Sequence, residues 1–118
     1  MHPNAALGQF GEDLATRHLE ELGCEILERN WRCRAGELDI VARDGDVLIV
    51  CEVKTRRSHR YGSPIEAITP RKLSTLRTLA LTWISEHAVN ARNVRLDVIG
   101  ITTDGPNGLV LHHVRGVS

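Results

Sequence analysis

Two carboxylates and one lysine, Asp39, Glu52 and Lys54, are the residues of this sequence best placed to do chemistry together. They lie in two apolar segments typical of strands. Asp44-Gly45 between the segments predicts a tight hairpin turn, because both residues accept positive φ. That turn makes Asp39 and Glu52 diagonal neighbours on one face, with backbones roughly 7–8 Å apart, and Lys54 shares the face because side chains alternate along a strand. A turn at Gly45-Asp46 instead places the two carboxylates directly opposite each other.

The same face of the hairpin also carries Glu37, whereas the opposite face is apolar and is expected to be core. The expected core residues are Leu38, Ile40, Ile49, Cys51 and Val53. Carboxylates gathered this closely repel each other and are costly to desolvate without a partner. Converging carboxylate oxygens ligate Mg²⁺ or Mn²⁺, and the Lys54 ammonium neutralises such a site further. The alternative is a solvated strand face with ordinary surface ion pairs.

Helical patterns flank this hairpin on both sides. Ala5–Leu22 is apolar at helical spacing and ends at Gly23, which tolerates positive φ. Its expected buried stripe consists of Leu7, Phe10, Leu14, His18 and Leu22. Glu12 falls at the margin of that stripe, near the core boundary. Thr69-Pro70 predicts an N-cap and the first turn of a second helix, which continues to about His87.

Strand patterns fill most of the remaining chain. They are Glu25–Cys33, Glu37–Ala42, Asp46–Lys54, Val94–Ile101 and Leu109–Val114, with a polar loop expected over Thr55–Ser63. The order of helix, three strands, helix and two strands contains no linker and no repeat. At 118 residues it predicts one α/β domain, residues 1–118, with a mixed sheet. Within this domain, Arg95 and Asp97 are expected to form a structural ion pair. His18 is expected to be a core or supporting residue and not a catalyst.

Composition narrows the classes of function. Fifteen Lys and Arg balance fifteen Asp and Glu, so an overall basic protein is excluded, although a local basic face is not. No apolar stretch approaches the roughly 20 residues of a membrane-spanning helix, and the first residues lack the pattern of a secretory signal. Three separated cysteines form no disulfide framework and show no ligand spacing with the histidines, which disfavours zinc and predicts a cytoplasmic location.

Asp39 followed by Glu52-Val53-Lys54 resembles the D…(E/D)xK signature of the restriction-endonuclease-like, or PD-(D/E)xK, nuclease superfamily. The chain as a whole resembles the YraN-like family of small bacterial proteins over about four-fifths of its length. The segments that carry this resemblance are Gly8–Ala15, Asn30–Arg32, Gly36–Val41, Cys51–Arg56 and Arg95–Val98.

The resemblance implies a restriction-endonuclease-like αβββαβ core with a mixed central sheet and a metal-dependent nuclease site. Glu12 of the first helix occupies the place of a further metal-binding carboxylate. Asp39 and Glu52 match the two strand carboxylates, Lys54 matches the catalytic lysine, and the Val53 carbonyl matches an additional ligand. The expected cofactor is Mg²⁺ or Mn²⁺, and the expected reaction is phosphodiester hydrolysis. A fold by itself does not establish that activity.

A basic segment follows the motif and predicts contacts to nucleic acid, with DNA, including branched or repair intermediates, as the expected substrate. Its expected contact residues are Arg56, Arg57, Arg60, Arg71 and Lys72. Two alternatives stay open: a nucleic-acid-binding module that uses the nuclease scaffold without efficient cleavage, and a protein–protein adaptor with vestigial carboxylates. A homodimer is also an open interpretation, since the fold that the resemblance implies also occurs in archaeal Holliday-junction resolvases, whose chemistry needs two active sites.

Overall fold

The computed structural model describes residues 3–58, 63–91, 93–105 and 108–117. The elements are α1 (Pro3–Glu21), β1 (Glu25–Cys33), β2 (Gly36–Asp44), β3 (Val47–Arg56), the 3₁₀ turn η1 (Pro64–Ala67), α2 (Pro70–His87), β4 (Asn93–Gly105) and β5 (Gly108–Val114). Their order confirms the sequence prediction, with β4 longer than expected and η1 added between the expected loop, Thr55–Ser63, and α2. Neither helix, among the residues described, is long and apolar enough to cross a membrane.

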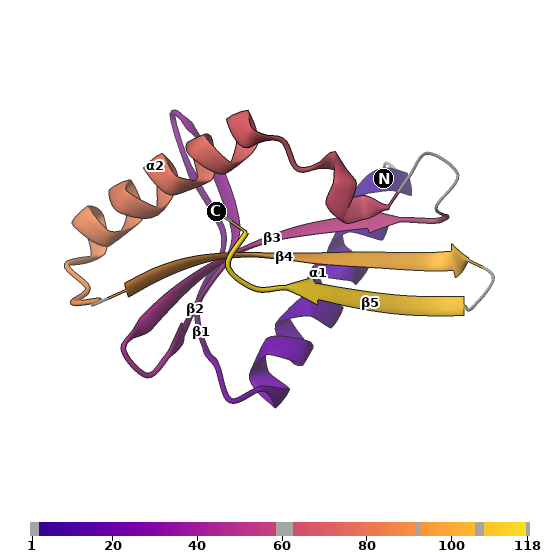
Figure 1. Ribbon diagram of the computed structural model, residues 1–118, viewed down its shortest axis with the longest axis horizontal. Coiled ribbons are helices and arrows are strands. Elements are labelled where there is room, and N and C mark those ends of the chain that lie inside the picture. Colours follow the sequence, from indigo (N-terminus) through magenta and orange to yellow (C-terminus); the bar gives the residue numbers. More distant parts are fainter. Residues whose placement is uncertain (1–2, 59–62, 92, 106–107, 118) are drawn as a thin grey trace.

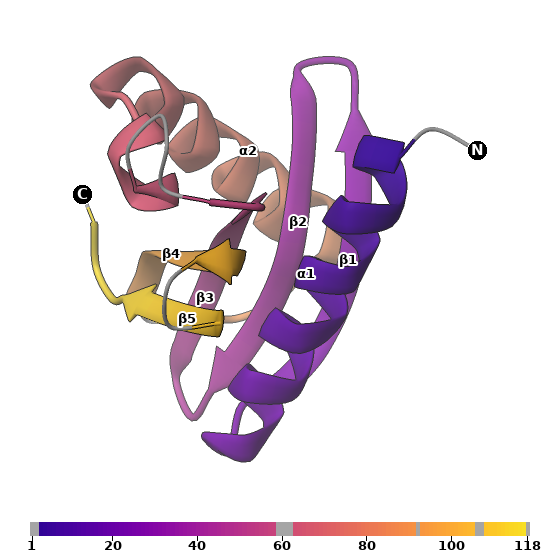
Figure 2. The ribbon, with the colours of Figure 1, turned by 90° about the vertical axis from the view of Figure 1, so that its right-hand side faces the viewer.

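The five strands form one mixed sheet in the order β1-β2-β3-β4-β5. Only β3 and β4 run parallel, and the other neighbours are antiparallel. The two helices lie on opposite faces of the sheet, α1 against one and α2 against the other (Figures 1 and 2). Helix, three strands, helix and strand make the predicted αβββαβ-type core, and β5 extends the sheet beyond β4.

The β2–β3 hairpin turns one residue later than the first expectation. Asp44 pairs with Val47, so Gly45 and Asp46 form the turn and Gly45 adopts a positive φ of 60°. Asp44-Gly45 and Gly45-Asp46 both satisfy the turn rules, and the register that buries the apolar side chains decides between them. Counting along this register places Asp39 across from Glu52.

Both faces of this hairpin are core, which corrects the prediction of a single apolar face. Val41, Leu48 and Val50 pack with α2 in one buried cluster, whereas Ile40 and Ile49 pack with α1 in the other. Leu38 belongs to the α2 cluster, not to that of Ile40. The helices cover both faces, so the polar side chains do not form an exposed strand surface. They are confined to one end of the hairpin.

The buried side of α1 is rotated relative to the predicted stripe. Phe10 and Leu22, expected in the core, are 45% and 43% exposed. The buried residues of α1 are Gly11, Glu12, Ala15 and Leu19. Gly11 lies so close to β3 that a Cβ on it would overlap the side chain of Thr55. Small residues determine which side of this helix faces the sheet, because they allow the backbone to approach.

A chain of polar contacts joins α1 to strands β4 and β5 of the sheet. His18 Nε2 lies 3.0 Å from His113 Nδ1, and His113 Nε2 lies 2.8 Å from Asp97 Oδ2. Asp97 is fully buried and accepts hydrogen bonds from Arg95 Nε and the Gly116 N–H at 2.9 and 3.1 Å. The predicted Arg95–Asp97 ion pair is therefore confirmed, and His18 connects elements of the fold.

The Gly11 contact predicts opposite effects for two neighbouring glycines of α1. Gly8→Ala should stabilise the protein by about 0.5–1 kcal/mol, because nothing lies within 4 Å of a Cβ there and alanine favours the helix. Gly11→Ala should instead destabilise it by about 1–3 kcal/mol through overpacking against Thr55. Urea unfolding of the two variants measures both. Equal free energies for the pair would contradict the close approach of α1 to β3.

The Asp97 network predicts an acid-sensitive contribution to stability. Burial raises the pKa of Asp97, but hydrogen bonds from Arg95, His113 and Gly116 outweigh it and hold that pKa below its ordinary value. A depressed pKa stabilises the folded state above the unfolded-state pKa of about 3.9, and this stabilisation is lost as the pH falls through the folded-state value. Asp97→Asn should therefore cost about 3 kcal/mol at neutral pH.

In acid unfolding monitored by circular dichroism, the difference between wild type and Asp97→Asn should shrink below about pH 4. A difference that stays constant from neutral pH to strong acid would show that Asp97 acts through packing and not through its charge.

Candidate functional site

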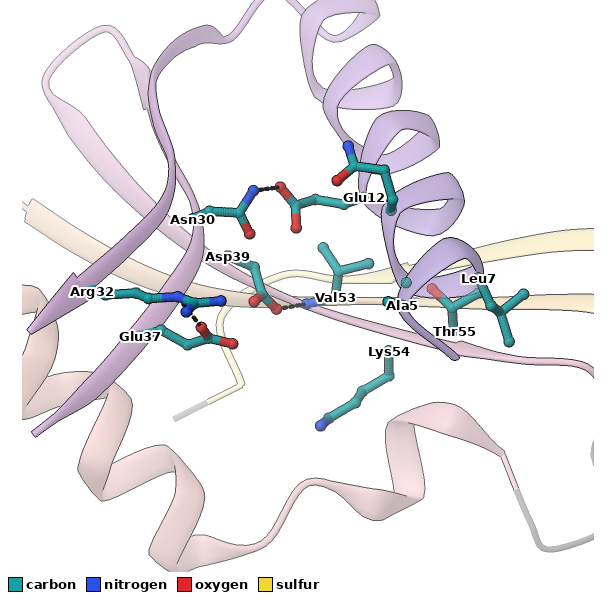
Figure 3. Close-up of a pocket in the computed structure, with 12 residues that line it drawn as sticks. Ala5, Leu7, Glu12, Asn30, Arg32, Glu37, Asp39, Val53, Lys54 and Thr55 are labelled. Atoms are coloured by element: carbon teal, nitrogen blue, oxygen red, sulfur yellow. Dashed lines mark hydrogen bonds and ion pairs between the residues drawn. The ribbon is translucent and has the colours of Figure 1, made fainter. Parts of the chain in front are cut away.

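The candidate site lies where β2 and β3 stop pairing with each other. The last residues in register are Ile40 and Cys51. One step further, Asp39 Oδ2 accepts a hydrogen bond from the Val53 N–H at 2.8 Å (Figure 3). The Asp39 carboxylate thus accepts a hydrogen bond that a main-chain carbonyl accepts in a regular strand pair. The strands consequently part at the residues that the sequence predicts for catalysis.

A pocket of about 420 Å³ opens at this point. Residues from α1, β1, β2 and β3 line it: Ala5, Leu7, Gly8, Gln9, Glu12, Asn30, Arg32, Glu37, Asp39, Val53, Lys54 and Thr55. Figure 3 shows the Asp39 carboxylate between β2 and Val53, with Glu12 approaching from α1 and Lys54 extending on the other side. Four of the five predicted site residues therefore line one hollow: Glu12, Asp39, Val53 and Lys54.

Asp39 is electrostatically the most perturbed group of this pocket. Burial and then the negative charge of Glu52 raise its pKa from 3.8 to about 7, against the opposing effect of the Val53 N–H. A hydrogen bond with Glu52 and the charge of Glu12 add to the rise. Two carboxyl groups in contact cannot both ionise without cost. The pocket therefore favours whatever brings positive charge to Asp39 and Glu52.

Glu52 lies behind the pocket and does not line it. It is only 4% exposed, within β3 and beside Val98 of β4. Its Oε2 atom lies 3.6 Å from Lys54 Nζ and 3.4 Å from Lys72 Nζ. Lys72, expected from the sequence only as a nucleic-acid contact, thus touches a carboxylate of the site. Its spacing of four residues from the buried Leu76 was the sequence signal for this position.

Glu12 is held by two residues of β1 that sequence reasoning did not connect with it. Its Oε1 atom accepts hydrogen bonds from Asn30 Nδ2 at 2.8 Å and from Arg29 Nε at 3.1 Å. Asn30 has a positive φ of 54°, which asparagine tolerates better than most residues. No spacing rule in the sequence links Glu12 to residues of another element. The other oxygen of Glu12 lies on the side of Asp39 in Figure 3.

The predicted nucleic-acid contacts do not line the pocket. Arg57 and Arg71 are exposed, and Arg57 lies 3.9 Å from Asp104. Arg56 is half-buried, and its Nε atom has no hydrogen-bond partner. Arg60 lies outside the described residues. The cations of the pocket lining are Lys54 and Arg32, the latter in an exposed ion pair with Glu37 at 3.0 Å.

The donor atoms of the pocket are oxygens, which suit a hard divalent cation. Within the described ranges no three His, Cys, Asp or Glu side chains gather as a ready-made metal cluster. Asp39 and Glu52 are in contact with each other, while the β1 residues hold Glu12 separately. Mg²⁺ commonly binds through one or two carboxylates and completes its shell with water and substrate phosphates. The residues present fit that pattern.

Fold and site together define a mixed-sheet α/β protein with an αβββαβ-type core and a carboxylate–lysine pocket at the β2–β3 divergence. The family model described as "Uncharacterised protein family UPF0102" matches residues 11–101. The chain belongs to this family, which confirms the resemblance to YraN-like proteins.

Its relatives are similar over almost their whole length. A UPF0102 protein of Nocardioides sp. is 54% identical, with 95% of this chain and 90% of the relative covered. One of Acidothermus cellulolyticus is 52% identical over 94% of this chain and 92% of the relative. One of Streptomyces griseus is 50% identical over both chains in full. The shared length places α1, β1–β3 and the pocket inside the matched region.

The raised pKa of Asp39 predicts that removing its charge stabilises the protein in the absence of divalent cations. Between pH 4 and pH 7 the unfolded chain loses a proton that folded Asp39 retains, so the stability of wild type falls as the pH rises. Asparagine keeps an oxygen for the Val53 N–H and carries no charge. Asp39→Asn should therefore be more stable than wild type by about 1–2 kcal/mol at pH 8, with a smaller gain at pH 5.

Urea unfolding in EDTA at the two pH values measures this gain. Asp46→Asn in the exposed hairpin turn is the matched control and should change stability by less than about 0.5 kcal/mol. Destabilisation of Asp39→Asn at pH 8 would show that the carboxylate is a structural group and not a strained functional one.

Proposed function

We propose that this protein is a divalent-cation-dependent nuclease that hydrolyses phosphodiester bonds in DNA. The observation that carries the proposal is the position of Asp39 across from Glu52 on neighbouring strands, with the Lys54 ammonium 3.6 Å from Glu52 and a pocket lined by Asp39 and Lys54. Like charges held close together and away from water weaken a fold unless they have a partner. Such a cost is expected to be retained where the charges serve a function. Hydrolysis of a phosphodiester supplies such a function, because it needs positive charge held close to a phosphate.

Asp39, Glu52 and the Val53 carbonyl would hold Mg²⁺ or Mn²⁺, with Glu12 at the edge of the same pocket. Such an ion, when bound, lowers the pKa of water and withdraws charge from the scissile phosphate. Two neighbouring carboxyl groups, one buried and one partly buried, can bind such an ion, since its divalent charge attracts both and offsets their mutual repulsion. The charge distribution of the pocket therefore supports a divalent cation as the cofactor.

Lys54 supplies the protein's own positive charge toward the substrate. Its side chain is 39% exposed, so the ammonium reaches the pocket while it stays 3.6 Å from Glu52. From there it stabilises the negative charge that develops on the phosphate oxygens during attack by water. Glu12 is fixed by Arg29 and Asn30, which suits it to orient that water with the carboxylate oxygen that they leave uncovered.

Exposed arginines close in sequence to Lys54 and Lys72 favour a substrate with a phosphate backbone, which we propose to be DNA. Arg57 and Arg71 reach solvent, and a row of phosphates is their natural partner. Their part is to attract and align the backbone, whereas the reaction belongs to the pocket. Branched and repair intermediates are included in the proposal, since contacts to backbone phosphates carry no sequence information.

Cleavage of a panel of linear, branched and single-stranded DNA and RNA in Mn²⁺ tests the proposal. Asp39→Asn and Lys54→Ala should each lower the rate by at least about 100-fold, because each removes a group that stabilises charge in the transition state. Asp46→Asn and Arg17→Ala are the matched controls, since both residues are exposed and distant from the pocket lining, and they should retain the wild-type rate. EDTA should abolish cleavage.

Cleavage that survives both pocket substitutions would remove this site from the proposal. Binding of DNA in EDTA that weakens with salt, without cleavage in Mn²⁺, would favour a nucleic-acid-binding module on this scaffold. If the protein neither binds nor cleaves nucleic acid, the adaptor interpretation remains.

A further inference from the structure

Lys72 lies on the inward face of α2, although it is a charged residue in the first turn. It is spaced four, seven and eleven residues from Leu76, Leu79 and Trp83, which are all buried. That spacing keeps these side chains on one face of a helix. Arg71, one residue earlier, is exposed. The helix therefore directs Lys72 toward the sheet and Arg71 toward solvent.

The stability of α2 does not explain a lysine at this position. The positive end of the helix dipole lies at the N-terminus, where cations are unfavourable, and the first turn holds no acidic residue. Thr69 caps the helix by accepting a hydrogen bond from the Lys72 N–H at 3.1 Å. The backbone of Lys72 is thus fixed by the cap, while its side chain carries a charge that the helix disfavours.

The compensation for that charge comes from β3. Lys72 Nζ lies 3.4 Å from Glu52 Oε2, the same oxygen that Lys54 Nζ approaches to 3.6 Å. Glu52 is nearly buried, so its carboxylate has little water to replace either ammonium. Both lysines therefore compensate the charge of Glu52, whereas Asp39 has no ion pair among the described contacts.

We propose that Lys72 is an internal counter-ion of the site: it holds the Glu52 carboxylate in place when no divalent cation is bound, and it competes with that cation for Glu52. The inference rests on the proposed function, since it assigns a role within the same cation site. Lys72 is a positioning residue that acts through Glu52. Competition follows from charge, because a cation at Glu52 lies close to two ammonium groups that repel it.

Isothermal titration with Mn²⁺ at pH 8 tests the competition. Lys72→Met removes the charge and keeps most of the stem, so it should bind Mn²⁺ about 3–10-fold more tightly than wild type. Lys72→Arg keeps the charge and should stay within about twofold of wild type, as should Arg71→Met, the exposed neighbour on the same helical turn. Unchanged or weaker binding by Lys72→Met would overturn the proposal.

A stability cycle in EDTA tests the contact without any cation. Lys72→Met should reduce the folding equilibrium constant about 5–30-fold in wild type, because it leaves Glu52 short of a partner. The reduction should be much smaller in a Glu52→Gln background, where no charge needs a partner. Equal losses in the two backgrounds would mean that Lys72 serves only packing, and the proposal would fail.

The outcomes separate this inference from the nuclease activity. Tighter Mn²⁺ binding by Lys72→Met together with a coupled stability cycle supports Lys72 as the counter-ion even if no substrate is cleaved, and in that case only the proposed function fails. Absence of Mn²⁺ binding by both wild type and Lys72→Met would overturn the competition and the cation-dependent function together.

Discussion

The hydrogen bond from the Val53 N–H to the Asp39 carboxylate is the contact on which the candidate site depends. It uses a main-chain donor of β3 just beyond the last paired residues of β2, so the strands part and a hollow forms between them. The same contact carries the Asp39 carboxyl group inward to Glu52. Covering helices on both faces then limit the access of water. The raised pKa of Asp39 is thus a consequence of how the sheet ends, together with the helices that enclose it.

Gathering acidic groups costs stability, and the protein offsets that cost with cations from several elements. Arg29 of β1 compensates Glu12, while Lys54 and Lys72 compensate Glu52. Asp39 has no ion pair of its own among the described contacts, and its charge is the least compensated in the site. An arrangement that leaves one partly buried carboxyl group unpaired is a poor solution for a purely structural interface. It is a suitable one where a bound cation completes the balance, which is why the electrostatics favour a functional pocket.

Local signals in the sequence predicted most of the elements. They failed where contacts between elements determine the register, the buried side of a helix or the partner of a side chain. The Thr69 cap predicted the start of α2, and the strand pattern of Glu25–Cys33 predicted β1, and the structure confirms both elements. The hairpin turn was displaced by one residue because Asp44-Gly45 and Gly45-Asp46 obey the same turn rules. The predicted buried stripe of α1 was wrong at Phe10. The spacing of apolar residues does not reveal the close approach of α1 to β3 that Gly11 permits. The pairing of Glu12 with Asn30 joins distant segments, so no periodicity reveals it.

Contacts outside the pocket determine whether α1 can contribute to it. Glu12 directly follows Gly11, the residue that lies against Thr55 of β3, so the close approach of the helix also sets the depth of this carboxylate. The next turns of α1 are fixed by His18, which reaches Asp97 of β4 through His113 of β5. Since β4 pairs with β3 beside Glu52, these contacts link α1, at Gly11 and at His18, to the strand that carries Glu52 and Lys54. The glycine and the histidine have no chemistry in the site, yet the relative position of its carboxylates depends on both.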